Sequence, residues 1–373
     1  MTTILRAADS AGLLRIVPSL AGFTPRNSLV LLPFHGSRTY GAMRIDLPSP
    51  STSLVPYAET AIDLVTRVGG ADAVAVIVYA DSGTEHTHDG LVLPHDVLMD
   101  EVLGCAEDAG LRVADALCAL PHGWASYLDD DPEIAPYDDS TPPAVPGLGD
   151  VTGDQLAGTA LPRVGLAVAE RVGRAFRSLE AGMCGVGQNA STTRDSPASA
   201  ALALLDDPPA LVERVLDAPD TLPTSETAAL LWCLSRPLLR DAALTQWATD
   251  LSDGRRALAA QLACADAGVP VPERVARVFV GHGPTPDPDR LRLALTAVRW
   301  IVAAAPRSAR PGPLAAAAWL SWALGRATHA GHYLGMALEI DPEHGLAGVL
   351  STMLRSAPLP EWAFRRGPVA AAT

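Results

Sequence analysis

Three histidines and two aspartates lie close together in the stretch EHTHDGLVLPHD, residues 85–96. Imidazole nitrogens and carboxylate oxygens are common ligands of divalent metals. However, the spacing of His86, His88 and His95 is not the H-x-x-x-H pattern that places two histidines on one helix face. The stretch is polar and lies between an expected strand and an expected helix. We interpret it as a solvated loop, with Asp96 near a helix start, and predict no metal site.

Absent residue types exclude several reactions. All 28 residues counted as Lys and Arg are arginines, so there is no lysine for a Walker A loop or a Schiff base. No G-x-S-x-G or H-E-x-x-H motif occurs. The five cysteines are far apart and form no C-x-x-C pair, which favours reduced, mostly buried thiols. We expect no cofactor and assign no catalytic residue.

Polar residues near the ends of expected strands are the best candidates for a ligand site. In α/β layers, ligands bind beyond the carboxyl ends of the strands. Asp46 and Asp81 each follow an expected strand, whereas Trp124 and Tyr127 are equally expected as packing residues. Asp81 is also a typical first residue of a turn. The candidate ligand-binding residues are Asn27, Ser28, Asp46, Asp81, Trp124 and Tyr127.

The stretch LLRIVPSLAGFTPRNSLVLL, residues 13–32, contains Asn27 and Ser28 and shows which elements position them. A helical pattern, capped by Asp9 or Ser10, ends at Gly22, and a buried strand follows. Pro18 is expected to kink or stop the helix. Because the glycine follows a helix rather than a strand, this junction is not a phosphate-binding loop.

The remaining elements of the first part alternate between strand and helix. TYGAMRIDLP indicates a hairpin partner for the first strand, and the apolar run ADAVAVIVYAD indicates a central strand. The other expected elements are helices around 55–68 and 95–109 and strands at 112–120 and 123–128. This order predicts an α/β domain with a mixed sheet over residues 1–128.

Charge divides the chain. Residues 1–150 hold 7 arginines and 21 acidic residues, whereas residues 151–373 hold 21 of each, so the net charge of −14 belongs to the first part. An acidic surface repels phosphate backbones, so nucleic-acid binding through the first part is not expected. No apolar run reaches the roughly 18 residues of a membrane helix, and the start lacks a signal-peptide pattern. We therefore expect a cytoplasmic protein that does not enter membranes.

The second part is predicted to be an all-α, helical-repeat-like domain. A stretch rich in aspartate and proline at 129–151 indicates a linker or long loop. Residues 152–373 contain successive short helical patterns rich in alanine and leucine, the first at about 155–181, with almost no strand signal.

Residues 311–345 resemble a tetratricopeptide helix pair. Gly325, Ala330, Ala337 and Pro342 follow the small-residue and proline spacing of that repeat. The small residues allow two antiparallel helices to approach closely, and the proline ends the second helix. A peptide-binding groove requires neighbouring repeats, and no second copy is found, so simple hairpin packing is the alternative interpretation.

Several stretches together resemble an actinobacterial family, domain of unknown function 4192. They are VPSLAGFTPRNSLVLL, RIDLP, AVAVIVYAD, GLRVADAL and GWASYLDDDPEIAP. The resemblance covers most of residues 10–145 and continues more loosely into the helical part. Where the family often has cysteines, this chain has Asp129, Ile134 and Ala135, so no metal or redox role is carried over. The resemblance implies an architecture and leaves the activity open.

Two functions are compatible with these features. The charge division, the tetratricopeptide-like hairpin and the missing catalytic motifs favour an intracellular protein-interaction or regulatory module whose partner is another protein. The alternative is a small-molecule enzyme or ligand-binding protein with its site at the strand carboxyl ends. That alternative would use carboxylates such as Asp46 or Asp81, and it requires a concave pocket around them. The sequence does not define the ligand, the partner or the oligomeric state.

Overall fold

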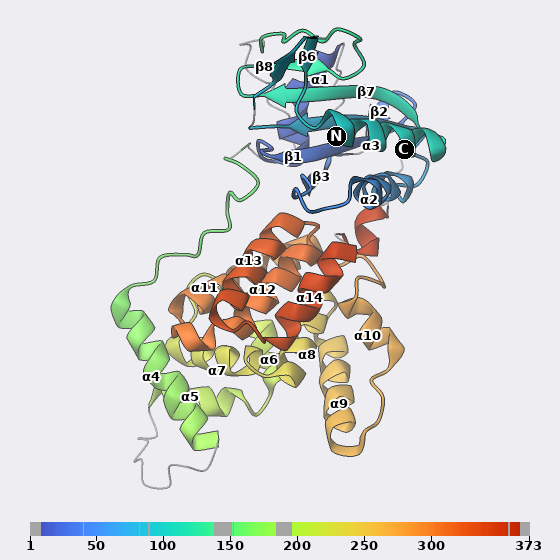
Figure 1. The fold of residues 1–373 in the computed structure, drawn as a ribbon. Coiled ribbons are helices and arrows are strands. Elements are labelled where there is room, and N and C mark those ends of the chain that lie inside the picture. Colours follow the sequence, from blue (N-terminus) through green and yellow to red (C-terminus); the bar gives the residue numbers. More distant parts are fainter. Residues whose placement is uncertain are drawn as a thin grey trace, which may run out of the picture. The chain divides into compact units, whose positions relative to one another are not determined.

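The computed structural model describes residues 9–39, 41–81, 83–88, 90–137, 151, 153–183, 196–356 and 359–365. The chain divides into two compact units: a sheet unit that ends at Ala157, and a helical unit that runs from Gly158 to Arg365. An α/β part with a mixed sheet is followed by an all-α part, which confirms the predicted fold class (Figure 1). Residues 138–150, most of the predicted linker, lie outside the described residues.

The sheet unit is built on one mixed sheet. Its strands are β1 (Ser28–His35), β2 (Arg38–Thr39), β3 (Met43–Asp46), β4 (Ala73–Tyr79), β7 (Arg112–Leu120) and β8 (Gly123–Ser126). Their order is β2-β1-β4-β7-β8, and β3 also pairs with β1. β4 and β7 are parallel to each other, and the other pairs are antiparallel. β4 is buried from Ala73 to Val78, as its continuous apolar run predicts for a central strand.

A small hairpin lies outside this sheet. β5 (Glu85–Thr87) and β6 (Gly90–Val92) pair with each other, and His86 lies opposite Leu91. The predicted loop over 85–96 is therefore wrong in this part, because strands of three residues are too short to show a period of two in the sequence. In the described part of the chain, no group of three or more His, Cys, Asp or Glu side chains is placed to hold a metal ion.

Three helices cover the two faces of the sheet. α1 (Ser10–Ala21) lies on one face, where Leu14 and Val17 pack against alternate residues of β1, β4 and β7. α2 (Leu54–Thr66) and α3 (Asp96–Asp108) cover the other face, where Ile62 and Met99 pack. Side chains of a strand point alternately to its two faces, so each strand contributes to both cores.

The ends of α1 follow the sequence prediction, but its middle does not. The Asp9 carboxylate accepts a hydrogen bond from the Gly12 amide at 2.8 Å, and Gly22, with a φ of 81°, ends the helix. The helix does not stop at Pro18 but continues to Ala21. Because Pro18 lies in the last turns, its missing amide removes one hydrogen bond without interrupting the packed face.

The helical unit contains eleven α-helices among its described residues. They are α4 (Leu166–Met183), α5 (Pro197–Leu204), α6 (Pro208–Arg214), α7 (Thr224–Leu234), α8 (Pro237–Ala248), α9 (Leu251–Ala267), α10 (Glu273–Phe279), α11 (Pro288–Ala304), α12 (Pro311–Ala323), α13 (Ala327–Ile340) and α14 (Gly345–Ser356). Two short 3₁₀ helices, η1 (Arg307–Ala309) and η2 (Glu361–Phe364), complete the unit. None of the described helices is long and apolar enough to cross a bilayer.

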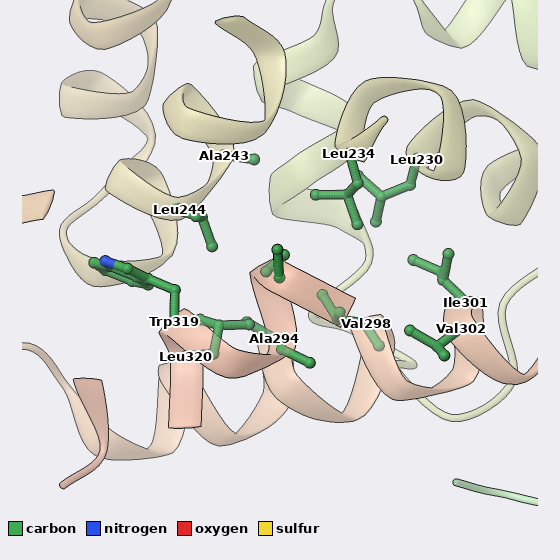
Figure 2. Packing of buried hydrophobic residues seen from close by; sticks show 14 of the residues in the cluster. Leu230, Leu234, Ala243, Leu244, Ala294, Val298, Ile301, Val302, Trp319 and Leu320 are labelled. Carbon is green, nitrogen blue, oxygen red and sulfur yellow. The ribbon is translucent and has the colours of Figure 1, made fainter. Parts of the chain in front are cut away.

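The core of the helical unit surrounds α12, every residue of which is buried. Figure 2 shows Trp319 and Leu320 of α12 among side chains of α7, α8 and α11, including Leu234, Leu244 and Val298. α13 packs along α12 through Ala330 and Ala337, both fully buried. Because α12 is enclosed on all sides, it presents no open face for a peptide.

The helix predicted over 155–181 begins later than expected, because α4 starts at Leu166. Residues 153–155 instead contact the sheet unit: the Thr24 amide donates to the Gly153 carbonyl at 2.9 Å. Gly158 and Pro162 lie before α4 and both disfavour a helix interior. Residues 153–155 therefore form a tether that packs on the sheet unit before the first long helix begins.

Candidate functional site

A pocket of about 420 Å³ lies in the sheet unit, within the size range of small-molecule sites. Its lining residues come from α1, the loop before β1, the ends of β4 and β7, and the segment after β8. They are Leu14, Arg15, Pro18, Thr24, Pro25, Arg26, Tyr79, Ala80, Asp81, Ala119, Leu120, Pro121 and Tyr137. Most of these side chains are apolar, and the charged ones are two arginines and one aspartate.

The topology of the sheet creates this pocket. β4 and β7 are parallel, and Tyr79 pairs with Ala119, so both chains leave the sheet at the same edge. The Ala80 amide still donates to the Ala119 carbonyl at 3.0 Å, after which the two chains diverge. α1 closes one side of the gap through Leu14. A crevice beyond the carboxyl ends of parallel strands is where α/β folds bind ligands.

Gln155, in the tether that follows β8, fixes the loop that carries Arg26. The Arg26 amide donates to Gln155 Oε1 at 3.1 Å, and Gln155 Nε2 donates to the Arg26 carbonyl at 2.9 Å. The Ser28 hydroxyl donates to the same carbonyl at 2.5 Å. Both backbone groups of Arg26 are therefore bonded, which pre-organises the loop at the pocket.

Asp81 and Asn27, both predicted site residues, contact each other at the rim of the pocket. Asn27 Nδ2 and Arg26 Nη2 donate to Asp81 Oδ2 at 2.9 and 3.1 Å, and the Asp81 amide donates to Asn27 Oδ1 at 3.2 Å. Asn27 has a φ of 42°, a left-handed conformation that asparagine tolerates better than most residues. Asn27 thus positions Asp81, and Asp81 in turn orients the Arg26 side chain.

Two tyrosines line the interior of the pocket. Burial raises the pKa of Tyr79, whose hydroxyl is buried and has no hydrogen-bond partner among the described residues. Burial also raises the pKa of Tyr137 to about 12, while its hydroxyl donates to the Leu120 carbonyl at 2.8 Å. Both phenols are therefore neutral near pH 7 and cannot serve as general bases there.

Ser28 and Asp46 belong to a neighbouring network and do not line the pocket. Ser28 lies opposite Asp46 on β3 and is fully buried. Arg44 bridges them: its Nε donates to the Ser28 hydroxyl at 2.7 Å, and its Nη2 donates to Asp46 Oδ1 at 2.5 Å. The Arg44 side chain is only 6% exposed, which gives this network a structural role at the edge of the sheet.

Trp124 and Tyr127 are also outside the pocket. Trp124, on β8, is half-buried in the core beneath α1, and its backbone pairs with Ala135. Tyr127 lies on the opposite face, where its hydroxyl donates to the Pro94 carbonyl. Burial raises the pKa of Tyr127 as well. Both act as packing residues, the alternative that their positions near a strand end also allowed.

The titratable side chains among the described lining residues are Arg15, Arg26, Tyr79, Asp81 and Tyr137. Asp81, the carboxylate among the described lining residues, is 40% exposed and is held by an ion pair with Arg26. The two tyrosines are neutral, and no histidine, cysteine or serine is among the lining residues that the structure describes. The residues that the sequence did not identify are Arg15, Arg26, Tyr79, Gln155 and Tyr137. Of these five, only Tyr79 was indicated by the sequence, because it lies two residues before Asp81 at the end of the expected strand.

Comparison with known proteins gives a family but no activity. Residues 11–361 match the model of the family described as domain of unknown function (DUF4192), and the chain belongs to this family. Neither the curated proteins nor the solved structures contain a match.

Proposed function

We propose that this DUF4192 family member binds a small organic molecule in the pocket of its sheet unit. The observation that carries the proposal is a cavity of about 420 Å³ at the carboxyl ends of β4 and β7, walled mainly by apolar side chains. A site of this kind combines an apolar surface with a few fixed polar groups. Here the fixed group is Arg26, whose backbone and side chain are both held in place.

Binding without catalysis is the simpler function for these residues. A hydrolytic or proton-transfer site requires a nucleophile or a base within hydrogen-bond reach of its partner. The lining residues in the described part of the chain supply no free nucleophile or base, and Asp81 is already engaged by Arg26 and Asn27. A sensor or carrier of a metabolite therefore fits the geometry better than an enzyme.

A fragment screen with a pocket-filling variant tests this proposal. Pro121 lines the pocket yet is exposed, so Pro121→Trp adds bulk at the pocket without replacing a core residue. His122 is the next residue, is also exposed and does not line the pocket, so His122→Trp is the matched control. We expect ligand-observed NMR hits that are lost with Pro121→Trp and kept with His122→Trp. A hit list that is the same for all three proteins would overturn the proposal.

A second proposal, recognition of another protein by the helical unit, rests on a different observation. Leu262, Val269 and Val280, on or beside α9 and α10, are 45%, 50% and 49% exposed. We propose that these side chains contribute to one contact surface, since contiguous exposed apolar patches mark such surfaces. Because α12 is enclosed, the contact would use this surface rather than a tetratricopeptide-like groove on α12.

The interaction proposal is tested by comparing proteins captured from a native lysate by the wild-type chain and by Leu262→Asp. The exposed Val349 supplies the control variant Val349→Asp on α14. Loss of a captured protein with Leu262→Asp alone would support the proposal, and identical captures would count against it. We place either activity in the cytoplasm, since the four described cysteines are free thiols, as a reducing compartment maintains them.

A further inference from the structure

Three arginines gather in the helical unit around the end of α12. Arg292 and Arg299 lie on α11, seven residues or about two turns apart, and therefore on one face of that helix. Arg326 directly precedes α13. Short connections make α12 an antiparallel neighbour of both α11 and α13, so the end of α12 brings Arg326 beside the start of α11 (Figure 1).

Hydrogen bonds place these side chains on the same side of α12. Arg299 Nη2 donates to the Ala160 carbonyl, and the hydroxyl of Tyr333, on α13, donates to the Thr159 carbonyl at 3.1 Å. Since the two acceptors are consecutive residues, Arg299 and Tyr333 lie close together although they belong to different helices. Burial raises the pKa of Tyr333, and the positive charges of Arg299 and Arg326 oppose this rise, as expected of guanidinium groups near its hydroxyl.

Positive charge at this place exceeds negative charge. Arg292 pairs with Asp289, whose side chain is 83% exposed. Arg299 bonds to a carbonyl, and neither Arg299 nor Arg326 forms an ion pair with a carboxylate in the described part of the chain. Loss of solvation lowers the pKa of Arg326, and the charges of Arg292 and Arg299 lower it further. Two guanidinium charges are therefore left without an acidic partner among the described residues.

We propose that Arg299 and Arg326, with Arg292 adding positive charge, bind a phosphate group, either as inorganic phosphate or as part of a small phosphorylated molecule. The site lies in the helical unit and does not depend on the pocket of the sheet unit. Guanidinium groups offer paired N–H donors that match the oxygens of phosphate. A phosphate monoester carries a charge of about −1.5 to −2 at pH 7, which suits two unpaired guanidinium groups better than the single charge of a carboxylate.

The extent of the cluster favours one phosphate group over a nucleic-acid backbone. Arg292 and Arg299 span about 10 Å along α11. Asp287 and Asp289, at the start of α11, end the positive region on that side. A nucleic-acid backbone is bound by a row of positive groups that follows several phosphates. Such a row would have to pass these two aspartates.

A matched pair of probes tests the class of the anion. Phenyl phosphate and benzoate share one aromatic ring and differ in their anionic group. Isothermal titration of the full chain should show phenyl phosphate binding at least about tenfold more tightly than benzoate, with an affinity that falls as salt is added. Inorganic phosphate is titrated in parallel. Equal affinity for both phosphates would identify inorganic phosphate as the sufficient ligand, and tighter binding of phenyl phosphate would identify a phosphorylated organic molecule.

Arginine variants then locate the site. Arg326→Met should weaken phenyl phosphate binding at least about tenfold, because it removes one of the two unpaired charges. Arg326 is exposed, so this variant leaves the core unchanged. Arg299→Met should weaken binding as well. Arg274→Met is the matched control, because Arg274 is exposed on α10, outside the cluster, and its loss changes the net charge equally.

Several outcomes would overturn the proposal. They are equal binding of phenyl phosphate and benzoate, no binding of either phosphate probe, and phenyl phosphate binding that Arg326→Met retains in full. A single-stranded oligonucleotide that binds more tightly than phenyl phosphate and is weakened equally by Arg326→Met and Arg274→Met would indicate a nucleic-acid surface instead. The pocket-filling Pro121→Trp variant should bind phenyl phosphate as the wild type does. Loss of binding in that variant would place the anion in the sheet unit and contradict the proposal.

Discussion

Adding one methyl group to Gly312 should destabilise the helical unit. Gly312 lies in the first turn of α12, where a Cβ would lie 2.4 Å from the Leu234 carbonyl oxygen and 3.1 Å from Ser235 Cα. Contacts of a Cβ below 3.0 Å essentially do not occur, so α12 and the end of α7 must separate by about 0.6 Å. Both neighbours are backbone, and no side chain can rotate to make room.

The size of the effect follows from the enclosure of α12. Overpacking a close-packed core costs about 1–3 kcal/mol, and we expect about 2 kcal/mol for Gly312→Ala. For a unit of this size, that loss lowers the melting temperature by about 4–8 °C. Six of the seven tryptophans lie in the helical unit, so tryptophan fluorescence during urea or thermal unfolding reports mainly on it.

The same substitution elsewhere in the unit should have the opposite sign. Gly335 is exposed on α13, and a Cβ there meets nothing within 4 Å. Gly335→Ala should stabilise the unit by about 0.5–1 kcal/mol, because alanine loses less backbone entropy in a helix. The close approach of α12 to α7 would be refuted if Gly312→Ala were as stable as Gly335→Ala.

Three further predictions concern the site, the helical core and the thiols. Asn27→Ala should destabilise the chain by about 1 kcal/mol more than Asn27→Gly in urea unfolding, because glycine accepts the φ of 42°. Hydrogen bonds from Arg290 hold the pKa of Glu213 below its usual 4.5. The ionised carboxylate therefore stabilises the fold above pH 4.5, and this stabilisation is lost as the pH falls through the lowered pKa of the folded state. Glu213→Gln should therefore cost about 1–2 kcal/mol at pH 7 and flatten the loss of stability that the wild type shows as the pH falls below 4.5. Burial raises the pKa of Cys118, and that of Cys233 to about 12, so native protein at pH 8 should resist iodoacetamide at both thiols by mass spectrometry.

Each of these has a clear contrary result. Equal stabilities of the two Asn27 variants would show that the backbone at this position is not strained. A Glu213→Gln protein with the same pH profile as the wild type would show that the Arg290 pair contributes nothing to stability. Rapid alkylation of Cys118 or Cys233 in native protein would show that their burial is incomplete.

The sheet unit was predictable because its signals are local. The apolar run of β4 specifies a strand covered on both faces, and Gly22 specifies the end of α1. A topological rule about strand ends then identified Asp81, which the structure places at the rim of the pocket. These inferences need only the identity of neighbouring residues.

The pocket itself was not predictable, because it depends on contacts between distant residues. Gln155 binds Arg26 across 129 residues of sequence. Arg15 reaches the pocket only because α1 lies across the sheet beside the ends of β4 and β7. The face of the sheet on which the Tyr127 side chain lies likewise depends on how β8 pairs with β7. No local pattern in the sequence encodes these arrangements.

Fluorine NMR of protein labelled with 3-fluorotyrosine tests the central claim most directly, using a fragment that Pro121→Trp fails to bind. The chain has six tyrosines, and Tyr79 and Tyr137 line the pocket. We predict that the resonances of these two shift on titration, while those of Tyr127, on the opposite face of the sheet, and Tyr333, in the helical unit, stay fixed. Shifts at Tyr127 or Tyr333 with none at Tyr79 and Tyr137 would contradict it.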